Sequence, residues 1–149
     1  MELISGLSIL SLIAILSAAE QSDRKHIVSE SAAQFKLPFS DAVLVGNTLY
    51  VAGHIGLDAQ TGKPPATAEQ EARLAMEGIK KTVERAGMTM NELVSVQVFC
   101  SDLSHFEVFN TVYRTYFREP YPARAFLGSG PLLLGARFEV MGIAVRQAK

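Results

Sequence analysis

The sequence predicts one α+β domain in which a mixed β-sheet carries two helices on one face. The length of 149 residues suits a single domain, and 48% hydrophobic with 19% charged residues can build a packed core. Extended and helical patterns alternate in the order β-β-β-α-β-α-β-β. The strand patterns look apolar on both faces, although two helices cover only one. We therefore expect identical subunits to bury the face that carries Val96, Val98, Ile143 and Val145.

The first 21 residues differ from the rest of the chain. Residues 3–19 carry no charge and end in small residues, which predicts a signal peptide over 1–19 and a linker over 20–25. No Lys or Arg precedes the apolar run, and the run is short for a membrane span, so a membrane anchor and a retained start remain alternatives. We expect export to the periplasm or the exterior, with a cytoplasmic protein as the alternative and membrane attachment only if the leader is kept.

The domain is expected over residues 26–149, and its first half is rich in strands. Residues 26–29 form a short strand pattern, and residues 41–54 read as two strands joined at Gly46 and Asn47, a pair suited to a tight hairpin. A helix should begin after the N-cap Thr67, with Gln70 as its capping-box partner, and end at Gly87. Its apolar stripe contains Ala72, Ala75, Ile79, Val83 and Ala86.

The second half repeats the alternation. Residues 92–100 form a strand, and a second helix runs from about residue 102 or 104 to 117, where Pro120 and Pro122 stop it. Two more strands, over 123–129 and 136–145, complete the sheet.

Two charged side chains lie in apolar strand patterns and are candidates for chemistry. Alternation in the last strand puts Glu139 on the same face as Met141 and Ile143. This carboxylate either pairs with an arginine or, partly desolvated, moves protons to and from water. Arg124 either forms a structural ion pair or offers its planar fork to a substrate carboxylate. Asn110, in the middle of the second helix, either faces solvent or hydrogen-bonds a partner.

Composition excludes several other classes of function. The formal net charge is −1 with no basic stripe, so nucleic-acid binding has no electrostatic basis. Three scattered histidines and one cysteine exclude a Cys/His zinc framework and an intrachain disulfide. The single Cys100 is either a small buried hydrophobe or a nucleophile.

Four segments resemble a known family: "PFSDAVLVGNTLYVAGHIGLDAQTGKPP", "VFCSDLSHFEVFNTVYRTYF", "PYPARAF" and "RFEVMGIAV". They are similar to the Rid family, the reactive intermediate deaminases also called YjgF-like proteins, over about residues 26–146. The resemblance implies a chorismate-mutase-like fold and a homotrimer with a cleft at each subunit interface. It also implies hydrolysis of enamines and imines, such as 2-aminoacrylate and 2-iminopropionate, to 2-keto acids and ammonia, with no metal and no organic cofactor.

The resemblance also assigns residues. It implies that Arg124 grips the substrate carboxylate and that Glu139 positions the attacking water. It places Asn110 near the cleft and the Gly53 backbone along the pocket. Phe39 and Phe126 belong to the same substrate pocket by position.

The chain departs from the family pattern around these residues. Phe39 replaces a tyrosine, Ala125 and Phe126 replace smaller polar residues, and Met141 stands where a second glutamate is common. Ala52 and His54 replace Ser and Gln. The pocket is therefore expected to be more apolar, and turnover of the smallest imino acids stays open.

Three functions compete at this point. The first is an imine or enamine hydrolase acting on 2-imino acids. The second is a non-catalytic trimeric module that binds carboxylates or regulates a partner, and the third is a ribonuclease. We favour the enzyme, because a pure carboxylate binder gains nothing from Glu139 facing its ligand.

Overall fold

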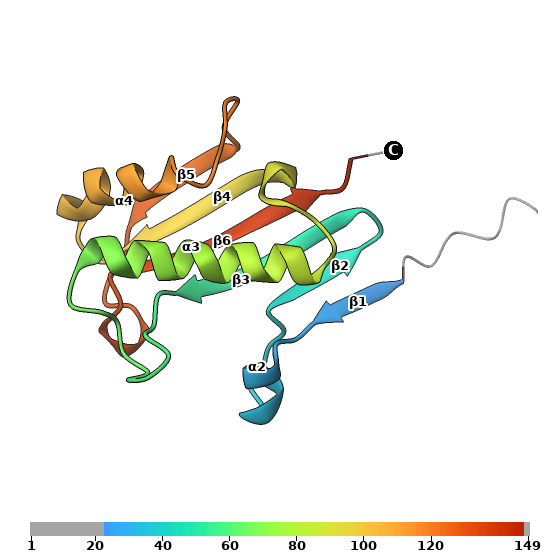
Figure 1. Cartoon of the computed structure of the whole chain (residues 1–149), viewed down its shortest axis with the longest axis horizontal. Helices are drawn as coiled ribbons and strands as arrows, with labels where there is room; N and C mark the ends of the chain where they lie inside the picture. The colour runs from blue at the N-terminus through green and yellow to red at the C-terminus, as the bar shows by residue number, and fades with distance from the viewer. Residues whose placement is uncertain (1–22, 148–149) are drawn as a thin grey trace, which may run out of the picture.

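A computed structural model describes residues 23–147 and shows a twisted sheet with two helices on one side (Figure 1). Within that range the sheet has six strands in the order β1-β2-β3-β6-β4-β5. All pairs are antiparallel except β4 with β5, so the sheet is mixed as expected. The elements are β1 (Arg24–Ile27), α2 (Glu30–Gln34), β2 (Ala42–Val45), β3 (Thr48–Ile55), α3 (Ala68–Arg85), β4 (Leu93–Cys100), α4 (Phe106–Tyr113), β5 (Ala123–Gly128) and β6 (Phe138–Val145).

The predicted hairpin and first long helix are confirmed. Gly46, with φ of 60°, turns β2 into β3. Thr67 caps α3 by accepting a hydrogen bond from the Gln70 amide at 3.3 Å, and Gly87, with φ of 72°, follows its last turn. The first strand begins at Arg24, two residues before the expected start of the domain.

Helix α2 was not predicted. Its five residues are too few to show a helical period in the sequence, and Ser29 specifies it locally by accepting a hydrogen bond from the Ala32 amide. The second long helix is also shorter than expected, since α4 ends at Tyr113 and turns cover the residues up to Phe117.

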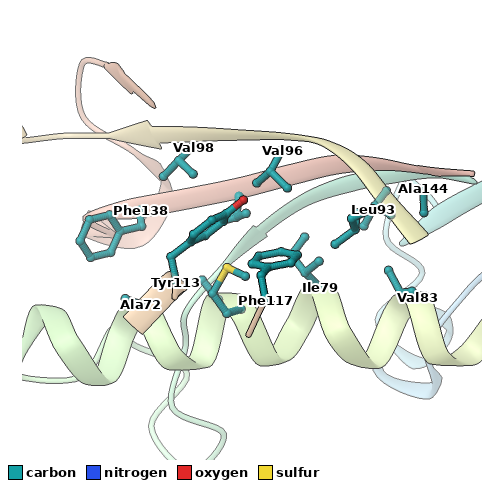
Figure 2. Close-up of a cluster of buried hydrophobic side chains, with 14 of the residues drawn as sticks. Ala72, Ile79, Val83, Leu93, Val96, Val98, Tyr113, Phe117, Phe138 and Ala144 are labelled. Atoms are coloured by element: carbon teal, nitrogen blue, oxygen red, sulfur yellow. The ribbon is translucent and has the colours of Figure 1, made fainter. Parts of the chain in front are cut away.

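The core fills the space between the sheet and the two helices (Figure 2). One assignment of faces was wrong: Val96 and Val98 lie in this core, 1% and 0% exposed, and not on the open face. They pair with Gly142 and Val140, the inward residues of β6, whereas Ile143 lies opposite Ser95 on the other side. The open face remains largely apolar through other residues, namely Tyr50, Phe99, Leu127, Met141, Ile143 and Val145.

A buried ion pair joins α3 to the start of β6. Glu71 is 0% exposed, and its carboxylate accepts hydrogen bonds from the backbone amides of Arg137 and Phe138 and from the Arg137 guanidinium at 2.6 Å. These charge-assisted bonds replace strand pairing where β6 begins. They fix the register of the strand that carries Glu139.

The expected signal peptide over 1–19 lies outside the described residues. Between residues 23 and 147, no helix has both the length and the apolar character needed to span a membrane.

Candidate functional site

Arg124 lies on the edge strand β5, on the helix side of the sheet. Its register partner in β4 is the buried Val96, and its guanidinium carbon lies 4.6 Å from the centre of the Tyr113 ring. Phe126 and Phe106 place two more rings at 5.7 and 5.9 Å. A guanidinium at these distances is attracted by the ring faces, so aromatic contacts hold Arg124 in place.

The structure does not support the ion-pair interpretation of Arg124. Among the described residues the arginines that form ion pairs are Arg73, with Glu69, and Arg137, with Glu71. Stacking on a ring occupies the face of a guanidinium and leaves its in-plane N–H groups free to donate. Arg124 can therefore donate hydrogen bonds to the carboxylate of a bound ligand.

Helix α4 lines a pocket of about 450 Å³ beside this guanidinium. Asn110 is 8% exposed and lies on the pocket wall, one helical turn from Tyr113. Phe126 packs edge-on against the Phe106 ring at 5.0 Å. The complete lining is Phe106, Glu107, Asn110, Tyr113, Arg114, Tyr121, Pro122 and Arg124.

Tyr113 is a pocket residue that sequence reasoning missed. In the described part of the chain its hydroxyl is the one buried side-chain polar atom without a hydrogen-bond partner. Burial raises the pKa of the phenol to about 12, although the nearby Arg124 charge opposes the rise. Its helical spacing from Asn110 was the available signal, but the same spacing is typical of a core residue.

Glu139 lies on the open face of β6, between the buried residues Phe138 and Val140. Its carboxylate rests on the Gly53 backbone so closely that a Cβ at position 53 would overlap Oε1. Only glycine permits this approach. Gly53 and Glu139, both site residues implied by the resemblance, therefore lie side by side in the structure.

Within one chain, however, Arg124 and Glu139 do not meet. Arg124 faces the helices from the edge strand, and Glu139 faces away from them in the interior of the sheet. Phe39 is in a third place, 55% exposed in a groove with α2 and β1. The site residues therefore fall into an Arg124 half-site (Asn110, Tyr113, Arg124 and Phe126) and a Glu139 half-site (Gly53 and Glu139).

The remaining candidate from the sequence is not reactive. Cys100 is fully buried, its Sγ donates to the Asp102 carbonyl at 3.0 Å, and burial raises the pKa of its thiol. Cys100 is therefore a core residue. Over residues 23–147, no group of three or more His, Cys, Asp or Glu side chains is arranged to hold a metal ion.

Comparison with known proteins gives a consistent result. Residues 29–146 match the family model described as Endoribonuclease L-PSP. A mouse protein named 2-iminobutanoate/2-iminopropanoate deaminase is 35% identical over 124 residues, which cover 83% of this chain and 92% of the mouse protein. A reactive intermediate deaminase of Escherichia coli, TdcF, is 33% identical over 114 residues, or 74% of this chain and 88% of TdcF.

Solved structures show the same fold. The E. coli yjgF gene product superposes with a TM-score of 0.75 at 32% identity, covering 83% of this chain and 99% of that chain. A crystal structure of E. coli TdcF with bound serine gives a TM-score of 0.70 at 33% identity, covering 74% and 89%.

Proposed function

Since the chain belongs to the endoribonuclease L-PSP family, which includes the Rid proteins that its sequence resembles, we propose that it is an imine deaminase. It hydrolyses 2-imino acids and their enamine tautomers, of the 2-iminopropanoate and 2-aminoacrylate type, to 2-keto acids and ammonia. Relatives at 33–35% identity carry names for this activity. The serine bound to TdcF has the α-carboxylate and α-nitrogen of such a substrate.

One observation carries the proposal: Arg124 is surrounded by three aromatic rings and paired with no carboxylate of the described chain. A substrate carboxylate supplies the missing counter-charge through a two-pronged contact with the guanidinium. Asn110 lines the same pocket, which supports a hydrogen bond from its side chain to the bound acid. The Arg124 half-site thus binds and orients the substrate.

Glu139 performs the chemical step in this proposal. Its carboxylate accepts a proton from water as the water oxygen attacks the imine carbon, and the C=N bond becomes a C–N single bond. That proton passes from the carboxyl group to the nitrogen and gives a neutral carbinolamine. The carboxylate then takes the hydroxyl proton and delivers it to the amino nitrogen, so that the C–N bond breaks, the carbon forms C=O and ammonia leaves. One water is consumed for each ammonia released, and every proton is accounted for by the carboxylate and the water.

We propose that two copies of the chain complete each site, within a closed trimer. The separation of Arg124 from Glu139 on opposite faces supports this assembly, because neither half-site alone contains both a carboxylate grip and a base. The apolar open face supports it too, with Tyr50 52% and Leu127 44% exposed around the row that holds Glu139. Phe39 then joins the pocket from its groove near α2.

Mixing two inactive variants tests function and assembly together. Arg124→Ala and Glu139→Gln are each prepared, unfolded and refolded together, and assayed for keto-acid release from an enzymatically generated imine. Random trimers in which each site spans two copies regain about a quarter of the wild-type activity. If the mixture regains no activity although the wild type has a mass near three chains by light scattering, each site lies inside one chain. A wild type that binds 2-keto acid but releases none from the imine would be a carboxylate-binding module.

A ribonuclease has less support. Phosphate contacts to RNA need a positive surface, and this chain has 14 basic and 15 acidic residues.

We further infer that the protein is exported and cut near Ala19. The uncharged run over residues 3–19 and the small residues at its end support this inference. Amino-terminal sequencing of the protein from its own host tests it, and an intact Met1 in a soluble cytoplasmic fraction would contradict it.

A further inference from the structure

The register of β3 against β6 is interrupted beside the Glu139 half-site. Val51 pairs with Gly142 and His54 pairs with Val140, so two residues, Ala52 and Gly53, oppose one residue of β6. This is a β-bulge, which turns the backbone and leaves peptide groups without their usual ladder partners. It is the feature that turns Gly53 toward the Glu139 carboxylate.

The His54 ring ties this bulge to helix α3. Nδ1 lies 2.8 Å from the carbonyl oxygen of Ala52, and Nε2 lies 2.9 Å from the hydroxyl of Thr82. A carbonyl only accepts, so Nδ1 carries the proton and donates, and Nε2 accepts from the Thr82 hydroxyl. The neutral tautomer with its proton on Nδ1 therefore satisfies the His54 ring, the Ala52 carbonyl and the Thr82 hydroxyl together.

Helix α3 is built around this ring. Gly78 leaves the space that the ring needs, because a Cβ there would lie 2.7 Å from His54 Cδ2. Glycine is otherwise unfavourable inside a helix. Thr82 is 0% exposed, and its hydroxyl has His54 as its side-chain partner. Gly78 and Thr82 both have low helix propensity, and the His54 ring on β3 explains why each stands in α3.

We propose that His54 is a positioning residue for the Glu139 half-site: it holds the β3 bulge so that the Gly53 backbone stays against the Glu139 carboxylate. The role rests on the proposed function, in which Glu139 activates water. His54 touches no substrate, and its contribution passes through the backbone of Ala52 and Gly53.

The charges around the ring make this arrangement sensitive to acid. Burial lowers the pKa of His54, and Arg85 on α3 acts in the same direction, while the Ala52 carbonyl, Asp41 and Glu139 oppose them. Protonation would put a second donor at Nε2, so the Thr82 hydroxyl would have to turn and accept. The pH at which kcat falls on the acid side (the acid limb of the pH–kcat profile) should therefore depend on Thr82.

Substitutions in α3 test the proposal, first in the wild type and then in a background that lacks the His54 ring. Gly78→Ala pushes a methyl group into the ring and should lower kcat on the order of tenfold to a hundredfold, while keto-acid binding at Arg124 stays within about twofold. In a His54→Ala background the same Gly78→Ala change should have no further effect. Gly130→Ala is the matched control, because position 130 has open space around it. Thr82→Val should shift the acid limb, and Thr82→Ser should restore it.

Two results would overturn the proposal. One is an equal loss of kcat from Gly78→Ala with and without His54. The other is an unmoved Gly53 amide resonance in both Gly78→Ala and Thr82→Val, measured by NMR. The resonance decides the positioning role even if the wild type releases no keto acid, an outcome that would refute the proposed function alone.

Discussion

Arg124 and Glu139 are built into the same sheet by different means. Arg124 stands on an edge strand, and side-chain rings hold its guanidinium at 4.6 to 5.9 Å. Glu139 stands on an interior strand, and its carboxylate lies against the backbone of a neighbouring strand at Gly53, where a Cβ would overlap it. The contacts of Arg124 are thus made by side chains, whereas Glu139 lies against a backbone segment that lacks a side chain.

This difference teaches how the two tasks are separated. In the proposed function the Arg124 half-site binds the substrate carboxylate, and its contacts are made by aromatic side chains. In the same proposal the Glu139 half-site supplies the base for proton transfer, which must lie close to the reacting carbon. Substitutions should therefore affect binding at one half-site and turnover at the other.

Glu139→Gln should give the largest effect. The amide keeps the shape of the side chain but cannot take a proton from water, so kcat should fall about 10²–10⁴-fold. Calorimetric binding of a 2-keto acid should stay near the wild-type value. Lost binding together with lost turnover would show that the two half-sites are not separated by task.

Arg124→Lys should give the next largest effect. Lysine keeps the charge but loses the planar fork and the stacking on Tyr113, so kcat/KM should fall on the order of a hundredfold. Keto-acid affinity should fall with it, in contrast to Glu139→Gln. If Arg124→Ala binds the keto acid as tightly as the wild type, the guanidinium is structural.

Two substitutions of Tyr113 test the roles of its ring and of its hydroxyl separately. Tyr113→Phe removes a buried hydroxyl that has no partner among the described residues, and should raise the free energy of unfolding by about 1 kcal/mol. It keeps the ring under Arg124, so keto-acid binding should persist. Tyr113→Leu should weaken binding through loss of the ring face. Urea unfolding and calorimetry measure both, and a destabilised Tyr113→Phe would mean that the hydroxyl has a partner in the assembled protein.

Acid should lower the stability of the folded protein through protonation of His54, which lies beside the Glu139 half-site. Its pKa in the folded protein is below the ordinary 6.5, so the unfolded chain binds the proton more readily. The stability that comes from keeping His54 neutral is therefore fully present above pH 6.5, and it is lost as the pH falls below 6.5 toward the lowered pKa of the folded protein. The urea midpoint should therefore be lower at about pH 5.5 than at about pH 7.5. Asp58 and Asp102, whose pKa values are lowered from 3.8, titrate well below this window.

Local signals in the sequence predicted most of the fold. Thr67 and Gly87 mark the ends of α3, and Gly46 marks the hairpin. The face of β4 was assigned wrongly although the alternation indicates it: Val96 and Val98 belong to a wholly apolar set, whereas the other set contains Ser95 and Gln97. The pairing of Val96 with Gly142 confirms that the apolar set faces the helices.

The site was predictable in its residues but not in its arrangement. The residues alone left Arg124 and Glu139 with structural alternatives, and the family resemblance favoured their functional roles. Their placement on opposite faces follows from register and strand order, which involve contacts distant in sequence. Tyr113 was missed because an aromatic residue on a helix stripe is an ordinary core pattern. His54 was noted only as a departure from the family pattern, because a histidine in an apolar strand is also typical of a core.

The position of β6 has a consequence for the order of folding. It is the last of the described strands along the chain, yet it lies between β3 and β4 in the sheet. On the ribosome, β3 and β4 emerge before the strand that joins them, so the two halves of the sheet wait apart until β6 is made. The Glu71 carboxylate, 66 residues before Arg137, has no arginine to pair with until then. The proposed general base, Glu139, thus arrives with the strand that closes the sheet, and a chain released before β6 lacks both a complete core and that carboxylate.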